Sequence, residues 1–404
     1  MLKGKHILIG ISGGIAAYKI PDLIRRLRKE GAEVKVTTTR HALEFVTELT
    51  LQTLSANKVY SDVFAAINDH STEHISLPDW ADLMVVAPAT ANVLGKMANG
   101  IADDALTTTF CAMRKPVVIA PAMNDKMYAN EAVRDAFETL SGRKHITILD
   151  CAEGELACGT TGKGRMQEID AILEAVRFAL TPKDLAGKQV LITAGPTQEH
   201  LDPVRFISNH SSGKMGNALA LECWRRGAII HYVCGPISAL PVLPAFYQRD
   251  TLFNVSPVTS AQEMTEAVLQ VSEKAHLIIL CAAVADFTPV NVAAEKIKKR
   301  PGQTTQTLQL TLTTDIAATL GQRKREGQTL VGFALETTDE QANALHKLQS
   351  KNLDYIVLNS LQDTGAGFGC NTNKVTVYAA NGTKKDVPLL SKENVAVQII
   401  NEIV

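Results

Sequence analysis

Short apolar runs alternate with amphipathic stretches along the chain, and this alternation predicts its elements. KHILIGISGG is typical of a buried strand that runs into a glycine turn, and the following stretch to residue 39 predicts a helix ending at Gly31 and a second strand. Further strand-like runs are ADLMVVAPAT, KPVVIAPAM and HITIL. Strands that alternate with helices predict a parallel, doubly wound α/β sheet, with ligands beyond the carboxyl ends of its strands.

This pattern lapses at residues 181–188, TPKDLAGK, and then starts again with QVLITAGPT. GKHILI and GKQVLI each open a strand, and each half closes a helix on Gly-Ala before its next strand. The second half carries about 20 extra residues, QEHLDPVRFISNHSSGKMG, where nucleotide-binding folds place a phosphate loop. We therefore predict two tandem Rossmann-like domains, at residues 1–182 and at residues 187–404, the second of them nucleotide-binding.

Composition supports this division and excludes several classes of protein. A chain of 404 residues exceeds the size of one hydrophobic core, and a net charge of −1 gives no reason to expect nucleic-acid or membrane partners. No apolar run reaches the roughly 18 residues of a membrane span, and the N-terminus lacks a signal-peptide pattern. Seven cysteines without CxxC spacing fit reduced thiols better than disulfides or a zinc site. We expect a soluble cytoplasmic protein.

Three loops of small residues follow predicted strands of the first half. Residues 10–14, GISGG, lack the GxGxxG spacing of a dinucleotide site, yet backbone amides at a helix start still suit an anion. A plain tight turn explains the same residues equally well. Residues 88–92, PATAN, and 121–124, PAMN, form the other two loops. Loops at neighbouring strand ends can converge on one flat ligand.

A glycine-rich segment, residues 152–167, surrounds Cys158. A Walker A loop would need glycine at position 157 and Ser or Thr at position 164, where the sequence has Ala157 and Gly164. Cys151 and Cys158 lie seven residues apart without a nearby histidine, which gives little support to a metal site. Two interpretations stay open: a glycine-hinged lid that closes a thiol over a site, and a flexible linker with an incidental cysteine.

Four motifs of the first half, GISGGIAAYK, HISLPDWADLMVVAPATANVLGKMANGIADD, APAMN and ACGTTGKGRM, resemble the flavin-dependent cysteine decarboxylases, and in particular the phosphopantothenoylcysteine decarboxylase domain of coenzyme A synthesis. The resemblance implies that His74 acts as a base or an electrostatic stabiliser, that Asn124 holds the substrate carboxylate, and that Cys158 is a proton donor on a substrate-covering flap. Taken singly, a histidine placed like His74 before a buried strand is more often structural than catalytic, and Asn124 could simply cap a turn or helix. The implied FMN-binding residues are Ser12, Gly13, Gly14, Ile15, Thr39, Thr90, Ala91, Asn92 and Met123.

The chemistry of this family suits those residue types. A carboxylate beside an amide and a CH2SH group has no electron sink, so direct loss of CO2 would leave an unstabilised carbanion. Oxidation of the CH2SH group to a thioaldehyde by FMN would supply the sink, and a hydride and a proton would return afterwards. The resemblance assigns the proton to Cys158.

The second half gathers Arg205, Asn209, Ser211, Ser212 and Lys214 before a predicted helix, which suits either a phosphate site or a capped helix start. With AAVADF, EKIKK, GFALET and KNLDYIVLN, this half resembles phosphopantothenate–cysteine ligase. The resemblance implies that Asn209 and Arg205 hold an acyl-cytidylate and that Lys296 acts in catalysis. The implied CTP contacts are Ala282, Asp286, Lys296, Thr311, Leu312, Thr313, Thr314, Phe333, Lys347 and Lys351.

The two resemblances together cover nearly the whole chain and imply a bifunctional enzyme. They imply a flavodoxin-like flavoprotein domain at residues 1–182 and a nucleotide-binding ligase domain at residues 187–404. CTP would activate the carboxylate of 4'-phosphopantothenate, and cysteine would displace CMP, with Mg2+ neutralising the triphosphate. The sequence does not identify the Mg2+ ligands. The family also implies a homo-oligomer, with decarboxylase trimers that have flavin sites at subunit interfaces and ligase dimers, together a dodecamer. A NAD(P)-linked oxidoreductase is disfavoured because GxGxxG is missing, and a flavoprotein without decarboxylase activity because His74 and Cys158 are both present.

Overall fold

The computed structural model of the chain describes residues 2–64, 73–155, 159, 161–299, 301–360, 365–367 and 369–404. Its internal contacts divide it into two compact units. The first unit is Met1–Thr181 with Val242–Thr251, and the second is Pro182–Pro241 with Leu252–Val404. The short segment 242–251 lies within the range that the sequence analysis gave to the second domain, yet it packs as part of the first unit.

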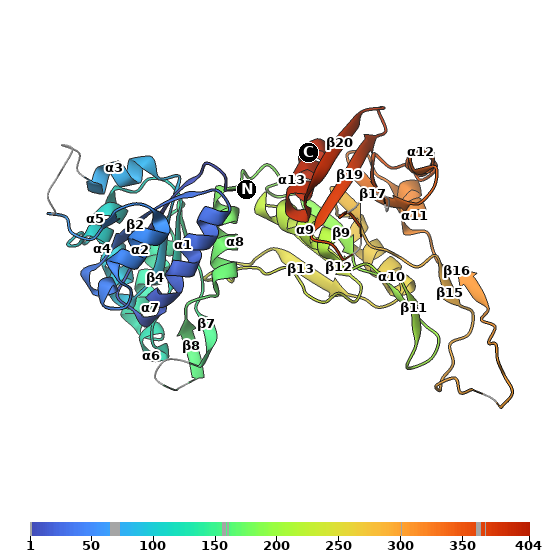
Figure 1. Cartoon of the computed structure of the whole chain (residues 1–404), viewed down its shortest axis with the longest axis horizontal. Helices are drawn as coiled ribbons and strands as arrows, with labels where there is room; N and C mark the ends of the chain where they lie inside the picture. The colour runs from blue at the N-terminus through green and yellow to red at the C-terminus, as the bar shows by residue number, and fades with distance from the viewer. Residues whose placement is uncertain are drawn as a thin grey trace. The chain divides into compact units, whose positions relative to one another are not determined.

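The first unit is built on a six-stranded parallel sheet in the order β3-β2-β1-β4-β5-β6. Figure 1 shows its strands β2 and β4 among the helices of the unit. The doubly wound α/β fold is therefore confirmed, and its strand order is that of a Rossmann sheet rather than the flavodoxin order. Because the order reverses between β1 and β4, the loops after these strands border the crevice where such folds bind ligands. The strands are His6–Ile11 (β1), Glu33–Thr38 (β2), Val59–Tyr60 (β3), Leu83–Ala89 (β4), Val117–Pro121 (β5) and Ile146–Ile148 (β6).

The helices of this unit follow from apolar periodicity and from their caps. In α1, Ile20, Leu23, Ile24 and Leu27 are all buried, which is the stripe that a helix presents to a sheet. The helix α5 begins with a capping box at Asp104. The helical segments are Ile15–Lys19 (η1), Ile20–Lys29 (α1), Arg40–Glu44 (η2), Glu48–Ser55 (α2), Glu73–Trp80 (α3), Ala91–Asn99 (α4), Ala105–Ala112 (α5), Asp125–Tyr128 (α6), Glu131–Ser141 (α7) and Ile169–Leu180 (α8).

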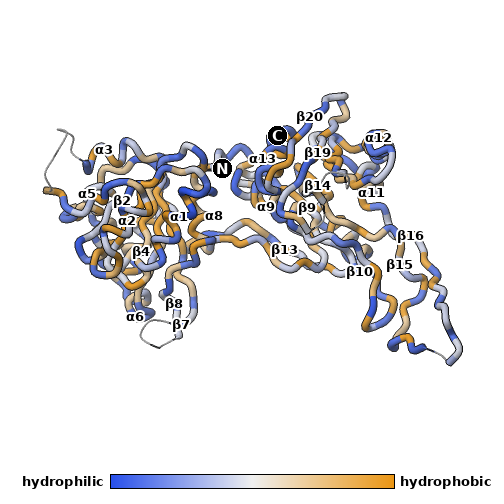
Figure 2. Tube along the Cα trace, in the orientation of Figure 1, coloured by the Kyte–Doolittle hydropathy of each residue, from blue (hydrophilic) through white to orange (hydrophobic). Residues whose placement is uncertain are grey.

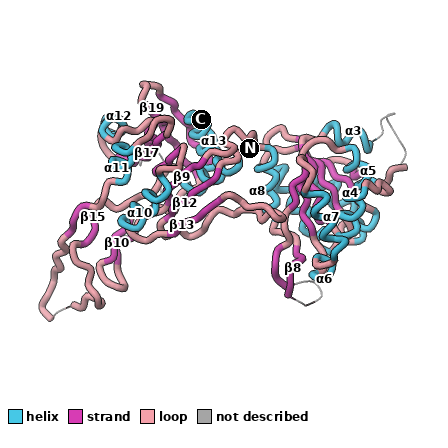
Figure 3. The backbone as a smooth tube through the Cα atoms, turned by 180° about the vertical axis from the view of Figure 1, so that it is seen from behind, coloured by secondary structure: helices cyan, strands magenta, loops and turns pink. Residues whose placement is uncertain are grey.

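An antiparallel hairpin stands apart from this sheet. It consists of Ala152–Glu155 (β7) and Thr161–Arg165 (β8), and it leaves the body of the unit between β6 and α8 (Figure 3). The hairpin carries the glycine-rich segment that the sequence analysis singled out.

The second unit repeats the strand order of the first. Its eight-stranded sheet runs β13-β12-β9-β14-β17-β18-β19-β20, and only β19 and β20 are antiparallel to their neighbours. The first six strands, taken in chain order, therefore follow the same 3-2-1-4-5-6 arrangement. The strands are Gln189–Ala194 (β9), Ile229–Cys234 (β12), Phe253–Pro257 (β13), Leu277–Leu280 (β14), Thr329–Glu336 (β17), Tyr355–Ser360 (β18), Thr372–Ala379 (β19) and Lys384–Ser391 (β20).

Two short ribbons and five helices complete the described part of this unit. One ribbon pairs Gln198–His200 (β10) with Phe206–Ser208 (β11), and the other pairs Phe287–Pro289 (β15) with Leu310–Leu312 (β16). The helices are Lys214–Arg225 (α9), Ala261–Ser272 (α10), Ile316–Arg323 (α11), Glu340–Ser350 (α12) and Lys392–Ile403 (α13).

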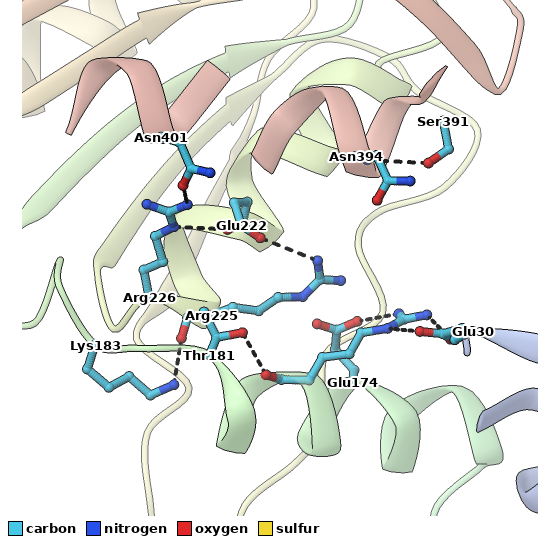
Figure 4. A network of polar contacts seen from close by, with 11 residues as sticks. Glu30, Glu174, Thr181, Lys183, Glu222, Arg225, Arg226, Ser391, Asn394 and Asn401 are labelled. Carbon is cyan, nitrogen blue, oxygen red and sulfur yellow. Dashed lines mark hydrogen bonds and ion pairs between the residues drawn. The ribbon is translucent and has the colours of Figure 1, made fainter. Parts of the chain in front are cut away.

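Each unit has its own hydrophobic core, and the central strands β4 and β9 lie among the most hydrophobic parts of the trace (Figure 2). Polar contacts also join elements of the second unit. Arg226, at the end of α9, donates to Glu222 at 2.9 Å and to Asn401 of α13 (Figure 4). Among the described helices, none is both long enough and apolar enough to cross a bilayer.

Candidate active sites

A cavity of about 980 Å³ opens at the carboxyl ends of β1, β2, β4 and β5 in the first unit. The three small-residue loops of the sequence analysis meet here, as expected for strand ends that share one edge of a sheet. The residues expected to bind FMN line this cavity, apart from Ser12: they are Gly13, Gly14, Ile15, Thr39, Thr90, Ala91, Asn92 and Met123.

Ser12 lies beneath the cavity and ties two of the loops together. It is fully buried, its hydroxyl donates to the Pro88 carbonyl oxygen at 2.7 Å, and the Thr90 amide donates to its Oγ at 3.0 Å. In this structure Ser12 thus holds the loop after β4 against the loop after β1.

The lining fits a flat ligand with an anionic end. An added Cβ at Gly13 would lie 2.6 Å from the Cβ of His41 in η2. Glycine therefore allows the first loop to pack directly against η2. Thr39 is buried, and its Oγ1 has no hydrogen-bond partner among the described residues, so it can bond to a ligand atom. The helix α4 begins at Ala91 without a side-chain cap, and its first backbone N–H groups have no intrahelical acceptor. These features suit FMN.

Asn124 lines the same cavity from the loop after β5. Its Oδ1 accepts from the Lys126 amide at 2.9 Å and so caps the short helix α6. The neighbouring Met123 amide donates to the Gly164 carbonyl oxygen of β8 at 2.9 Å. A Cβ at Gly164 would lie 2.2 Å from the Met123 carbonyl oxygen, so only glycine allows the hairpin to approach this loop.

The structure does not bring the other two expected catalytic residues into the described lining. His74 lies in the first turn of α3 and is half-buried, and it is not among the described residues that line the cavity. Cys158 lies outside the described residues. Other hairpin residues do line the cavity, namely Glu155, Gly164, Arg165 and Met166.

Sequence reasoning missed several charged residues of this lining. Lys96 of α4 pairs with Asp103 at 2.7 Å and with Asp104 at 3.1 Å. Lys19 and Arg165 both pair with Glu168, at 3.2 and 3.0 Å. Lys96 lies within the motif that contains PATANVLGKMANGIADD, but nothing in its spacing distinguishes it from the solvated lysines of any helix.

A second cavity, of about 310 Å³, lies in the second unit beside the ends of β14 and β18 and the start of α9. Asn209, Ala282 and Phe333 of the expected ligase residues line it. The side-chain Nδ2 of Asn209 donates to the Ala283 carbonyl oxygen at 3.0 Å. This hydrogen bond holds the loop before α9 against the loop after β14. Gly213 begins α9 with a φ of 73°, a left-handed conformation that favours glycine.

Two lysines give this cavity a positive character that the sequence analysis recognised only in part. Lys214, which was noted, donates to the Gly369 carbonyl oxygen at 2.9 Å and to Asn371 at 2.8 Å. Lys392, which was not, starts α13, and burial lowers its pKa from the usual lysine value. The two lysines are 178 residues apart in the sequence, so no local motif could join them.

The remaining expected CTP contacts form neighbouring groups outside this cavity. The Thr313 amide donates to the Asp286 carbonyl oxygen at 3.0 Å, and Thr311 and Leu312 belong to β16, with Thr314 directly after Thr313. Lys351 pairs with Asp315 at 2.8 Å, and Lys347 pairs with Glu336 at 2.6 Å. The structure thus joins Asp286 to the 311–314 stretch and sets Lys351 beside the next residue, Asp315.

Arg205 and the Lys296 loop are joined through a residue that the sequence analysis passed over. Asp202 is 1% exposed, and its carboxylate accepts from Arg205 Nε at 2.9 Å and from the Ile297 amide at 3.1 Å. Arg205 also donates to the Ile297 carbonyl oxygen at 2.7 Å. The Arg205 guanidinium holds the pKa of Asp202 well below the usual aspartate range.

Metal ligands are not evident in the described residues, where no group of three or more His, Cys, Asp and Glu side chains is arranged to hold an ion. Mg2+ stays an expectation that rests on the chemistry of nucleotide triphosphates.

Comparison with known proteins identifies the family. The model of the Flavoprotein family matches residues 1–180, and the model of the DNA/pantothenate metabolism flavoprotein C-terminal domain matches residues 185–404. The coenzyme A biosynthesis bifunctional protein CoaBC of Bacillus subtilis (strain 168) is 47% identical over 406 residues, covering 100% of this chain and 97% of the relative. The chain belongs to the CoaBC family of bifunctional coenzyme A biosynthesis proteins. The resemblance found in the sequence is thereby confirmed.

Two further comparisons lie within or beside the CoaBC family. A cysteine/cysteine sulfinic acid decarboxylase from an unknown prokaryotic organism is 46% identical over 364 residues, covering 89% of this chain and 98% of the relative. The solved C-terminal domain of a coenzyme A biosynthesis bifunctional protein CoaBC is 40% identical, covers 55% of this chain and 96% of that domain, and gives a TM-score of 0.45.

Proposed function

We propose that the chain makes 4'-phosphopantetheine in two steps. The second unit joins 4'-phosphopantothenate to cysteine with CTP, and the first unit decarboxylates the resulting phosphopantothenoylcysteine with FMN. The observation that supports this most directly is the convergence of three strand-end loops and Asn124 on one cavity of the first unit.

In the first unit, FMN would supply a reversible electron sink for loss of CO2. The Oδ1 of Asn124 caps α6, so its amide N–H groups are the atoms that would orient the substrate carboxylate. Thr39 Oγ1 and the first amides of α4 would bind the flavin and its phosphate. Cys158 would return a proton to the product, and His74 would act as a base or an electrostatic stabiliser.

In the second unit, the chain would stabilise charge on the nucleotide phosphates and on an acyl-cytidylate. Asn209 lines the cavity beside the loop after β14 and would hold the acyl group, together with Arg205. Lys296, Lys347 and Lys351 would counter the phosphate charge, with Mg2+ carried in by the triphosphate. The cysteine amine would then displace CMP and form the amide.

We further propose a cytoplasmic homo-oligomer, a dodecamer in which decarboxylase trimers join ligase dimers. Its partners would be the small-molecule substrates, with no nucleic acid and no membrane. The near-neutral charge of the chain is consistent with such partners.

The test is mass spectrometry of the products formed from phosphopantothenate, cysteine, CTP and Mg2+ by protein whose flavin content is known from absorbance. We expect phosphopantetheine, CMP and pyrophosphate, and weaker turnover with ATP. If phosphopantothenoylcysteine accumulates in yellow protein, the decarboxylase assignment is wrong, whereas the absence of CMP would remove the ligase assignment.

One relative favours a second candidate for the first unit, since its printed name gives cysteine and cysteine sulfinic acid as substrates. Free cysteine and cysteine sulfinate should therefore be assayed beside phosphopantothenoylcysteine. A preference for a free amino acid would support this alternative, and it would leave the ligase proposal untouched.

A further inference from the structure

Residues 242–251 leave the second unit's chain between β12 and β13 and fold as part of the first unit. Their aromatic side chains are buried there: the Tyr247 ring centroid lies 4.8 Å from that of Phe137, and Phe246 lies 5.6 Å from Phe178. The Tyr247 amide donates to the Ile148 carbonyl oxygen of β6 at 3.0 Å. Because β6 is the last strand of the sheet, the segment covers an edge that would otherwise lack a partner.

The segment also contacts the hairpin through Gln167. This side chain is 7% exposed, and its Nε2 donates to the Ala245 carbonyl oxygen at 2.5 Å and to the Asp150 carbonyl oxygen at 2.8 Å. In return, the Ala245 amide donates to Gln167 Oε1 at 3.1 Å, and the Asp150 amide donates to the Ala245 carbonyl oxygen at 2.8 Å. The side-chain amide of Gln167 thus donates to and accepts from the backbone of Ala245, and it also donates to the backbone of Asp150.

Asp150 and Gln167 stand just before and just after the hairpin β7–β8. The carboxylate of Asp150 accepts from the Tyr128 hydroxyl at 2.6 Å and from Lys163 of β8, also at 2.6 Å. Burial and this hydrogen bond raise the pKa of Tyr128 above the usual tyrosine value, so the phenol keeps its proton and goes on donating at neutral pH. Asp150, before the hairpin, and Gln167, after it, thus both bond to Ala245. This residue therefore joins the two ends of the hairpin.

We propose that Gln167 and the segment 242–251 are positioning elements for the first unit's reaction. They hold the base of the hairpin so that Gly164 and Arg165 lie against the flavin cavity, which both residues line. A piece of the second domain's chain is then required for the proper geometry of the first domain's site. This inference rests on the proposed decarboxylase function.

A purely structural role of Gln167 and the segment 242–251 predicts a different result from a positioning role. If the segment only covered the edge of the sheet, loss of the Gln167 hydrogen bonds would lower the stability of the first unit without changing the turnover of folded protein. A positioning role requires that the hairpin loosens and that turnover falls while flavin stays bound.

The experiment uses the flavin-loaded full chain and two independent variants. Gln167→Met keeps the length of the side chain and removes its amide. Ala245→Pro removes the backbone N–H that donates to Gln167 Oε1. Ala245→Ser keeps that N–H and changes only an exposed side chain, so it is the matched control. Amide hydrogen exchange of residues 152–155 and 161–165 is measured without substrate, and decarboxylation and ligation rates are measured on the same samples.

We expect exchange in the hairpin to rise in both variants. The rise should be about fivefold for Ala245→Pro, which loses one neutral hydrogen bond, and at least about tenfold for Gln167→Met, which loses three. The kcat of decarboxylation should fall by a similar factor, with flavin absorbance, ligation and the Ala245→Ser control unchanged. Unchanged exchange, or faster exchange with unchanged kcat, would overturn the inference. A wild-type protein that ligates but never decarboxylates would instead overturn the proposed function, and the exchange data would still decide whether Gln167 fastens the hairpin.

Discussion

Asn124 combines two roles that one substitution can separate. Its Oδ1 caps α6, and its amide N–H groups are proposed to hold the substrate carboxylate. Aspartate caps a helix as well as asparagine does, but it has no amide protons and it adds a negative charge. We expect Asn124→Asp to keep its fold and its flavin while the rate of CO2 release falls about 100-fold, since a hydrogen bond to a charged group contributes roughly 1.5–3 kcal/mol.

The matched control is Asn130→Asp. Asn130 caps α7 in the same way, accepting from the Ala132 amide at 3.0 Å, and it is not among the described residues that line the cavity. CO2 release and thermal unfolding should be unchanged in this variant. Equal losses of activity in both variants would mean that capping, and not carboxylate binding, explains the effect.

Gly13 is the residue of the first loop most sensitive to added volume. A Cβ there would lie 2.6 Å from the Cβ of His41 and 3.0 Å from its carbonyl carbon, so Gly13→Ala must displace the loop. We expect loss of most flavin absorbance in purified protein. Gly95→Ala, within α4, meets nothing within 4 Å and should keep its flavin and gain up to about 1 kcal/mol of stability. A yellow Gly13→Ala protein would show that this loop does not contact the cofactor.

At the scale of elements, the buried parallel strands were predictable because their apolar runs are local. The strands β1, β4, β5, β6 and β9 all coincide with such runs. The hairpin β7–β8 was not predicted as strands, since its glycines and charged residues carry no alternating pattern. Nor could the chain show that residues 242–251 pack on Phe137, because that burial comes from a partner more than 100 residues away.

The same limit applied to the sites. Loops at strand ends could be placed from topology, so most of the FMN residues were found. Asp202 was missed because its importance lies in a contact with Ile297, which is remote in sequence.

Asp202 joins the loop before β11 to the loop that follows Lys296, and this connection should matter for ligation. Asp202→Asn removes the charge that Arg205 pairs with. Its single oxygen can replace either Oδ2, which accepts from the Arg205 guanidinium and the Ile297 amide, or Oδ1, which accepts from the Val204 and Arg205 amides, but not both. We expect amide formation to slow by about tenfold, with decarboxylation unchanged. Asp22→Asn, which breaks an exposed ion pair with Arg26 on α1, is the control and should affect neither rate.

The pH dependence of this connection follows from the lowered pKa of Asp202. Because Arg205 lowers the folded-state pKa below the ordinary 3.8, the stability from this pair is fully present above that value and is lost as the pH falls through the folded-state pKa. The difference in urea midpoint between wild type and Asp202→Asn should thus be constant from pH 8 to pH 5 and should narrow only below 3.8. A difference that already narrows between pH 6 and 5 would contradict the assignment.

At the scale of the whole molecule, the place of His74 bears on assembly. Each described cavity is lined by residues of one unit only, and His74 on α3 is not part of the described lining of the first. If His74 acts in decarboxylation, a neighbouring subunit can supply it, as expected of the proposed trimer with interfacial sites. The site would then be complete only in the oligomer.

This hypothesis predicts complementation between two impaired proteins. Alone, His74→Asn should abolish CO2 release, and Asn124→Asp should lower its rate about 100-fold. When the two are unfolded together at equal concentration and refolded with FMN, each cavity draws Asn124 from one subunit and His74 from another. Random assembly should then restore about one quarter of the sites, and so about one quarter of the wild-type rate.

The control mixes Asn124→Asp with Gly13→Ala, whose defects both lie in the cavity of a single chain. No arrangement of those subunits places a native Gly13 and a native Asn124 in one cavity unless the chain itself is native, so the rate of CO2 release should not rise above that of Asn124→Asp alone. Recovery in the first mixture alone would establish that His74 acts across an interface. No recovery in either mixture, with oligomers of normal size by light scattering, would place His74 within its own subunit's site or outside catalysis.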